Sequence, residues 1–122
     1  MKSGAVPEEL LLQLASLPDE SARVAFLHQH AELFHAGVVE AIDEMIARRA
    51  RVNLQESLGL AEAALLIAEG TAEDRQQALG HAYRAKANVC YLLGNNQEAA
   101  SLHERALAAF EECGIALEAG RT

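Results

Sequence analysis

Apolar residues recur at intervals of three and four along most of this chain, the spacing that places them on one face of an α-helix. Proline, glycine, asparagine and aspartate interrupt the pattern, and these residues end helices or cap their first turns. The pattern therefore predicts an all-α protein of about six helices. Their expected ranges are 7–17, 19–30, 38–52, 54–69, 72–93 and 96–112.

Several helix ends carry recognisable signals. Asp19 can cap the second helix, and a turn through residues 36–37 is expected to separate that helix from the third. Residues 71–74, Thr-Ala-Glu-Asp, read as a capping box for the fifth helix. This helix is expected to continue through Gly80 at a cost of about 1 kcal/mol and to end at Gly94.

The apolar side of each long helix is expected to form the core. The expected core residues are Val38, Val39, Ile42, Met45 and Ile46 of the third helix, Leu58, Ala61, Ala64, Leu65 and Ala68 of the fourth, and Ala99, Leu102, Ala106, Ala109 and Phe110 of the sixth. The opposite side of the third helix, with Glu40, Asp43 and Glu44, is expected to face solvent.

The clearest signal is an internal repeat. Residues 53–70 (NLQESLGLAEAALLIAEG) and 95–112 (NNQEAASLHERALAAFEE) are identical at eight of eighteen positions when aligned at an offset of 42 residues. The identical pairs are Asn53/Asn95, Gln55/Gln97, Glu56/Glu98, Leu60/Leu102, Glu62/Glu104, Ala64/Ala106, Leu65/Leu107 and Glu69/Glu111. A period in this range indicates an array of helical repeats that pack on their neighbours.

Residues 80–112 resemble a tetratricopeptide repeat, a pair of antiparallel helices about 34 residues long. The resemblance rests on the small, aromatic and turn residues Gly80, Ala82, Tyr83, Ala87, Gly94, Ala99 and Ala106. It implies a right-handed solenoid of antiparallel helix pairs. Residues 53–122 would form the repeats, residues 7–52 an atypical N-terminal helical cap, and residues 1–6 a disordered N-terminus.

The order of segments also resembles the N-terminal helical array of bacterial multidomain proteins, in which such repeats precede an effector domain, for example a caspase-like protease of the CHAT type. The likeness lies in LASLPDESARVAFLHQHAELF, which comes before the stretches LAEAAL and ERALAAFEECG. It implies the regulatory front end of a larger protein. Residues 115–121 would start a further unit, which would leave the repeats open or truncated at the C-terminal end.

Composition narrows the classes of partner. The net charge of −8 argues against binding to nucleic acids or anionic membranes, because both require a basic surface. No apolar run approaches the roughly 18 residues of a membrane span. Cys90 and Cys113 do not have the spacing of metal ligands, so both are expected to be small core residues in a reducing compartment. We expect a cytoplasmic protein.

Candidate chemistry is sparse. His28, His30 and His35, with Glu32 nearby, suggest a metal site, but residues i and i+2 of a helix point about 200° apart, so His28 and His30 can converge only beyond a helix end. Surface histidines, with no metal and no cofactor, are the expected alternative. Cys90 is expected to be structural, and no phosphate-binding loop, GxSxG or HExxH motif is present. Nothing in the sequence indicates an enzyme.

The resemblance places His81, Arg84, Asn88 and Tyr91 on the concave groove of the array, which the first helix of each repeat lines. Arg84 and Asn88 are i, i+4 neighbours that can together hold a peptide carboxylate or backbone, although an ordinary solvated helix face is the alternative. If they do, alanine at both positions should weaken partner binding and leave the melting temperature nearly unchanged.

We therefore expect a non-enzymatic protein–protein interaction or scaffolding module that binds a protein or peptide partner. Two alternatives remain open. One is homo-oligomerisation, in which a second copy covers apolar surface at the C-terminal end. The other is a small metal-binding or metal-dependent protein that uses His28, His30 and His35.

Overall fold

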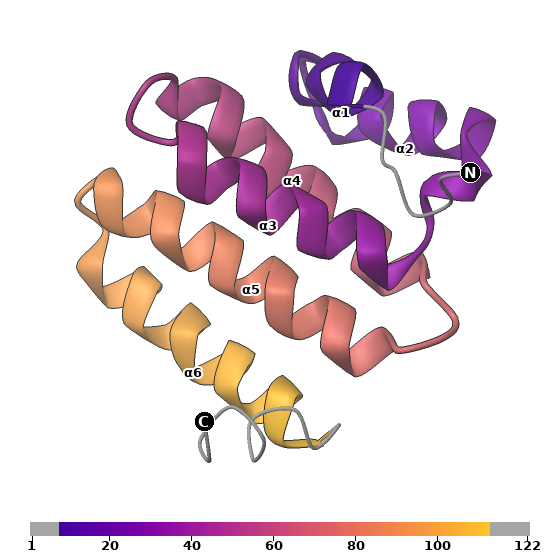
Figure 1. Ribbon diagram of the computed structural model, residues 1–122. Helices are drawn as coiled ribbons and strands as arrows, with labels where there is room; N and C mark the ends of the chain where they lie inside the picture. Colours follow the sequence, from indigo (N-terminus) through magenta and orange to yellow (C-terminus); the bar gives the residue numbers. More distant parts are fainter. Residues whose placement is uncertain (1–7, 113–122) are drawn as a thin grey trace.

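The computed structural model describes residues 8–112, and in that range the chain is all-α, with six α-helices, one short 3-10 helix and no β-strand (Figure 1). The helices are α1 (Glu8–Ala15), α2 (Glu20–Gln29), α3 (Ala36–Arg49), α4 (Leu54–Gly70), α5 (Arg75–Leu92) and α6 (Asn96–Glu112), and the 3-10 helix η1 spans Ala31–Leu33. The expected all-α class is confirmed. The predicted disorder of residues 1–6 and the further helical start at 115–121 lie outside the described residues.

Side chains cap three of the helices at their N-termini. Asp19 accepts a hydrogen bond from the Ala22 N–H at 2.9 Å, as predicted, and Asn53 accepts one from the Glu56 N–H at 3.0 Å. The predicted turn through residues Ala36 and Gly37 is wrong, because α3 already begins at Ala36. His35 caps α3 through Nδ1, which accepts from the Gly37 N–H at 2.9 Å, so the break between α2 and α3 falls at η1 and His35.

The predicted capping box at residues 71–74 is also wrong. The helix α5 begins at Arg75, and Asp74 adopts a left-handed backbone with φ of 58° and makes no side-chain cap. Thr71 instead serves the preceding helix, since its buried hydroxyl donates to the Ile67 carbonyl at 2.7 Å. This bond satisfies a carbonyl of the last turn of α4, which would otherwise lack a partner.

The long helices pack in a connected series. The helices α3 and α4 run in opposite directions side by side, and so do α5 and α6 (Figure 1). The helix α5 packs against α3, α4 and α6, and α1 packs against α4. The main core lies among α1, α3, α4 and α5, and a smaller cluster of Ala87, Cys90, Ala99 and Leu102 joins α5 to α6. Both clusters consist largely of the alanine and leucine that the sequence supplies.

Two glycines let helices approach closely. A methyl group at Gly59 would collide with the Ala15 carbonyl oxygen of α1, and one at Gly80 would lie 2.5 Å from Cε1 of Phe110 in α6. Glycine inside a helix costs about 1 kcal/mol relative to alanine. At Gly80 that cost is offset because the Phe110 ring occupies the space beside the backbone.

The two copies of the repeat coincide with α4 and α6 but have different surroundings. Leu60 and Ala64 of α4 and their equivalents in α6, Leu102 and Ala106, are all buried. In contrast, three buried small residues of α4 correspond to exposed polar residues of α6. These pairs are Gly59/Ser101, Ala61/His103 and Ala63/Arg105. The helix α4 is thus enclosed by its neighbours, whereas the described part of α6 has a polar outer side.

Candidate functional site on α3 and α5

The four predicted groove residues all lie on α5, but they fall into two groups. His81 is buried, with 9% of its surface exposed, and 47% of the Arg84 side chain is exposed. Both contact Asp43 of α3. Asn88 is partly buried and Tyr91 is 63% exposed, and both line a hollow further along the same two helices. The structure therefore separates a polar network, formed by His81 and Arg84, from an open surface lined by Asn88 and Tyr91.

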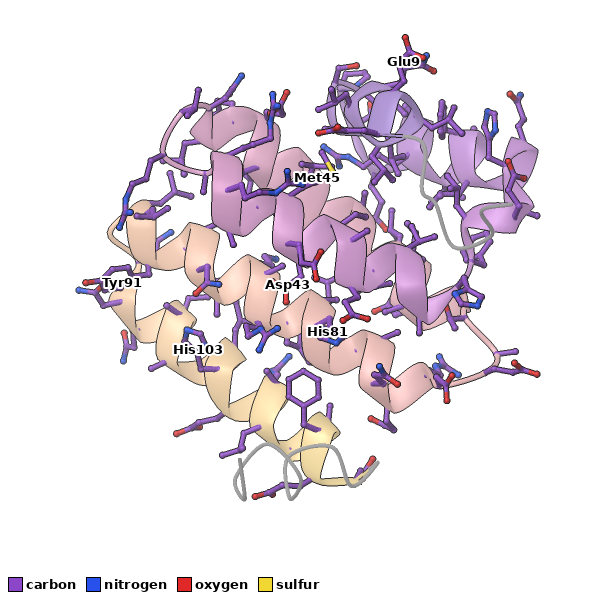
Figure 2. All side chains as sticks on the ribbon, in the orientation of Figure 1. Glu9, Asp43, Met45, His81, Tyr91 and His103 are labelled. Carbon is purple, nitrogen blue, oxygen red and sulfur yellow. The ribbon has the colours of Figure 1, made fainter. Side chains whose placement is uncertain are left out.

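Asp43 is the centre of the polar network. Its Oδ2 accepts hydrogen bonds from Nη2 of Arg84 at 2.7 Å and from Nε of the same guanidinium at 3.0 Å. Nδ1 of His81 lies 3.2 Å from the same oxygen, and Figure 2 shows Asp43 and His81 facing each other between α3 and α5. A buried carboxylate is costly unless it is paired, so Arg84 compensates the charge that α3 places in the interior.

The network extends to α6 through Phe110. The rings of His81 and Phe110 meet edge to face with centroids 5.1 Å apart, and Cζ of Arg84 lies 5.6 Å from the centroid of the Phe110 ring. Nδ1 of His81 is also 3.3 Å from Nη2 of Arg84, so its tautomer decides whether it donates to Asp43 or accepts from Arg84. In either case the polar contacts join α3 to α5, and the ring of Phe110 joins this network to α6.

This arrangement can orient side chains but lacks the rest of a catalytic centre. An aspartate beside a histidine resembles the orienting half of a catalytic triad. Within residues 8–112, however, His81 makes polar contacts with Asp43 and Arg84 only, so no hydroxyl or thiol is placed for activation. The geometry is that of a packing network between helices.

The prediction that Asp43 faces solvent is wrong. Asp43 is 5% exposed. It follows the fully buried Val39 by four residues, so the two side chains lie on the same side of α3, and Asp43 contacts His81 and Arg84 of α5. The only sequence signal is the pair His81 and Arg84, spaced i, i+3 on α5, whose ring nitrogen and guanidinium can hydrogen-bond to a buried acid. Using that signal requires knowing that α3 and α5 pack together.

A hollow of about 350 Å³ lies between the C-terminal ends of α3 and α5. It is lined by Ile46, Ala47, Ala50, Arg51, Asn88, Tyr91 and Leu92. Three of the four large exposed apolar side chains of residues 8–112 are at this end, namely Tyr91, Val52 (83% exposed) and Leu93 (40% exposed). Val52 follows Arg51 in the chain and Leu93 follows Leu92. We call this surface, the hollow together with Val52 and Leu93, the turn-end patch, because it adjoins the α3–α4 and α5–α6 turns.

A larger cleft of about 680 Å³ lies between the α1–α2 turn and the first half of α4. Arg23 lines it, and its Nε is buried without a hydrogen-bond partner, although Nη2 reaches the Leu17 carbonyl at 3.5 Å. Two glutamates of the cleft are already paired, Glu56 with Arg49 and Glu62 with Lys86. The cleft shares no residue with the turn-end patch, and its carboxylates make it a poor match for a carboxylate ligand.

The histidine cluster does not assemble into a metal site. His30 stacks on Phe26 with centroids 4.4 Å apart and lies 3.5 Å from Glu32, whereas Nδ1 of His35 is used as the cap of α3. His28 is exposed on α2. Among residues 8–112 no group of three or more histidine, cysteine, aspartate or glutamate residues is arranged to hold a metal ion. Each of these histidines therefore has a local explanation or faces solvent.

Cys90 is a buried thiol in the small cluster between α5 and α6, as predicted. Burial is the main cause that raises the pKa of this thiol, and the negative charge of Glu98 raises it further. A raised pKa keeps the sulfur protonated and weakly nucleophilic.

No protein-family model, curated protein or solved structure matches this chain. In the described residues, no helix combines the length and apolar character needed to cross a membrane. The function must therefore be argued from the surface of the molecule itself.

Proposed function

We propose that this chain is a non-enzymatic protein-interaction module, a right-handed array of antiparallel helix pairs of the tetratricopeptide type, which holds a peptide segment of its partner along α3 and α5. In a larger protein it would serve as a regulatory or scaffolding front end. The observation that carries the proposal is the turn-end patch, where the exposed ring of Tyr91 lies beside a hollow and Val52 and Leu93 are exposed at the same end of the molecule. Clustered exposed apolar side chains commonly mark interaction sites.

The residues of this surface suit peptide recognition. Tyr91 offers a large rigid ring with few rotatable bonds, and such residues dominate binding energy at protein interfaces. The Asn88 amide can both donate to and accept from a peptide backbone. The contacts of Asp43 with His81 and Arg84 support the proposal indirectly, because they hold α3 and α5 at a fixed separation before a partner arrives.

An enzymatic function has less support. The ionisable groups that meet on α3 and α5 are occupied with one another, and the Cys90 thiol is buried with a raised pKa. The exposed apolar surface, in contrast, has no role within the described residues.

A peptide-display experiment tests this function. The full chain is used to select binders from a random peptide library, and the affinity of selected peptides is measured by fluorescence anisotropy. Tyr91→Ser should weaken binding about tenfold or more, as expected for an aromatic residue central to an interface. Leu107→Ser is the matched control, because Leu107 is similarly exposed (54%) but lies on α6. Equal effects of the two substitutions, or no selected peptide at all, would argue against the proposal.

A further inference from the structure

We infer that the partner segment bound at the turn-end patch is an acidic peptide that carries an apolar side chain next to an aspartate or glutamate. The inference rests on the proposed function and specifies the chemistry of the partner. Three features lead to it, namely the unpaired arginines in and beside the patch, the balance of helix dipoles at this end and the size of the hollow.

The patch is cationic although the whole chain carries a net charge of −8. Arg51 lines the hollow, and Arg48 lies one turn earlier on α3. Both are exposed, and neither forms an ion pair within residues 8–112. Arg48 donates only to the Glu44 carbonyl at 3.4 Å, and the nearby Glu56 is already paired with Arg49. Two guanidinium groups are therefore available to a ligand.

Helix dipoles do not cancel this charge. The C-termini of α3 and α5 lie at this end and contribute partial negative charge, but the N-termini of α4 and α6 lie at the same end and contribute partial positive charge. Because these four contributions oppose one another in pairs, the helix dipoles leave the positive charge of the two arginines in place. A guanidinium group binds carboxylates through charge-assisted and often bidentate hydrogen bonds.

The hollow selects the apolar part of the peptide. Its volume of about 350 Å³ is at the small end of the range for ligand sites, so it suits one or two side chains and not a folded domain. Its apolar lining comes from Ile46, Ala47, Ala50, Leu92 and the exposed ring of Tyr91. A leucine or aromatic side chain in the hollow would place the adjacent backbone within reach of Asn88 and a neighbouring carboxylate within reach of Arg51.

Charge reversal provides the decisive experiment. Random-peptide selection is carried out with the wild-type chain and with Arg51→Glu, with Arg105→Glu as control. Arg105 is also exposed and without an ion pair in the described residues, so its reversal changes the net charge equally but on α6. We expect wild type and Arg105→Glu to select acidic peptides with a leucine or aromatic anchor. Arg51→Glu should bind those peptides about tenfold more weakly and select lysine- or arginine-containing peptides instead. Circular dichroism confirms that each variant is folded.

The outcomes separate this inference from the proposed function. If peptides bind and require Tyr91 but show no acidic preference, or if Arg51→Glu binds them as well as wild type, the acidic partner is refuted and the interaction module stands. If no peptide is selected, both fall. Sedimentation at several concentrations tests whether a second copy of the chain, and not a peptide, occupies the patch. Self-association that Arg51→Glu abolishes would show that a second copy fills the patch, which would overturn the peptide assignment.

Discussion

Arg84→Ala decides whether Arg84 belongs to the fold or to the binding surface. The substitution removes the donors at 2.7 and 3.0 Å from a carboxylate whose side chain is only 6% exposed. Removing one partner of a fully buried ion pair costs about 3–5 kcal/mol. Because 47% of the Arg84 side chain is exposed, water can replace part of its contact with Asp43, and the expected loss of stability is about 2 kcal/mol.

Chemical denaturation of the full chain measures this loss. For a domain of this size, about 2 kcal/mol corresponds to a decrease in melting temperature of roughly 6–10 °C. Arg105→Ala is the control, since an exposed arginine that forms no ion pair among residues 8–112 should change stability by less than about 0.5 kcal/mol. In an Asp43→Asn background the buried charge is absent, so Arg84→Ala should cost at least about 1 kcal/mol less than in the wild-type chain.

Two results would refute the reasoning. One is an Arg84→Ala variant as stable as Arg105→Ala, and the other is the absence of energetic coupling between positions 43 and 84. Either result would indicate that Arg84 does not stabilise the fold and is available to a ligand, as the sequence predicts. If the coupling is found, alanine at Arg84 and Asn88 together is a poor test of binding, because the melting temperature would fall as well. Tyr91→Ser is then the cleaner probe.

Three further predictions concern packing and protonation. Gly80→Ala should destabilise the chain by about 1–3 kcal/mol although alanine favours helices, because the added methyl group would collide with the Phe110 ring. Phe110→Leu in the same chain should recover part of this loss. Denaturation of the single and double variants measures both effects. Arg23→Met should leave the free energy of unfolding unchanged or increase it, because Nε of Arg23 is buried without a partner among the described residues. Arg49→Met is the control. It breaks an ion pair with Glu56 and should lower the free energy of unfolding by roughly 0.5 kcal/mol in the same denaturation experiment. For Cys90, whose folded-state pKa is raised above 9.0, the stability due to the protonated thiol is present below the unfolded pKa and is lost as the pH rises through the folded pKa. Wild type should therefore lose more stability than Cys90→Ala across pH 9.0, and parallel losses would contradict the burial of this thiol.

Much of the fold could be predicted because its helices follow local rules. Apolar spacing located the long helices, and the side chain of Asp19 caps α2 as expected. The errors fell where a tertiary contact replaced a local rule. Residues 71–74 have the composition of a capping box, but the Thr71 hydroxyl is buried against the last turn of α4, and Asp74 turns the chain with a left-handed backbone. His35 acts as a cap, a role for which sequence rules favour smaller side chains.

The candidate site was harder to predict because it lies between helices. The resemblance to a repeat family placed four residues on one side of α5, but it treated them as equivalent. Their contacts distinguish them, since the side chains of His81 and Arg84 contact the Asp43 carboxylate whereas Asn88 and Tyr91 line the hollow. The crossing of α3 over α5 determines that division, and no local pattern encodes a crossing point. The unpaired charge of Arg51 likewise becomes visible only once its neighbours are known.

The two copies of the internal repeat can be compared position by position to see which surfaces are polar and which are apolar. Leu60 and Leu102 are buried and apolar in both copies, and so are Ala64 and Ala106, because each copy packs within its own set of helices. Where a position is enclosed in α4 but exposed in α6, the residue changes from small to polar, as from Ala61 to His103. The outer side of α6 is therefore mostly polar over its described length, with Leu107 as a large apolar exception. Tyr91, Val52 and Leu93 lie outside the repeated segments, and all three are exposed at the same end of the molecule. The proposed partner is therefore expected at that end, where three large apolar side chains are exposed, and not on α6, where there is one.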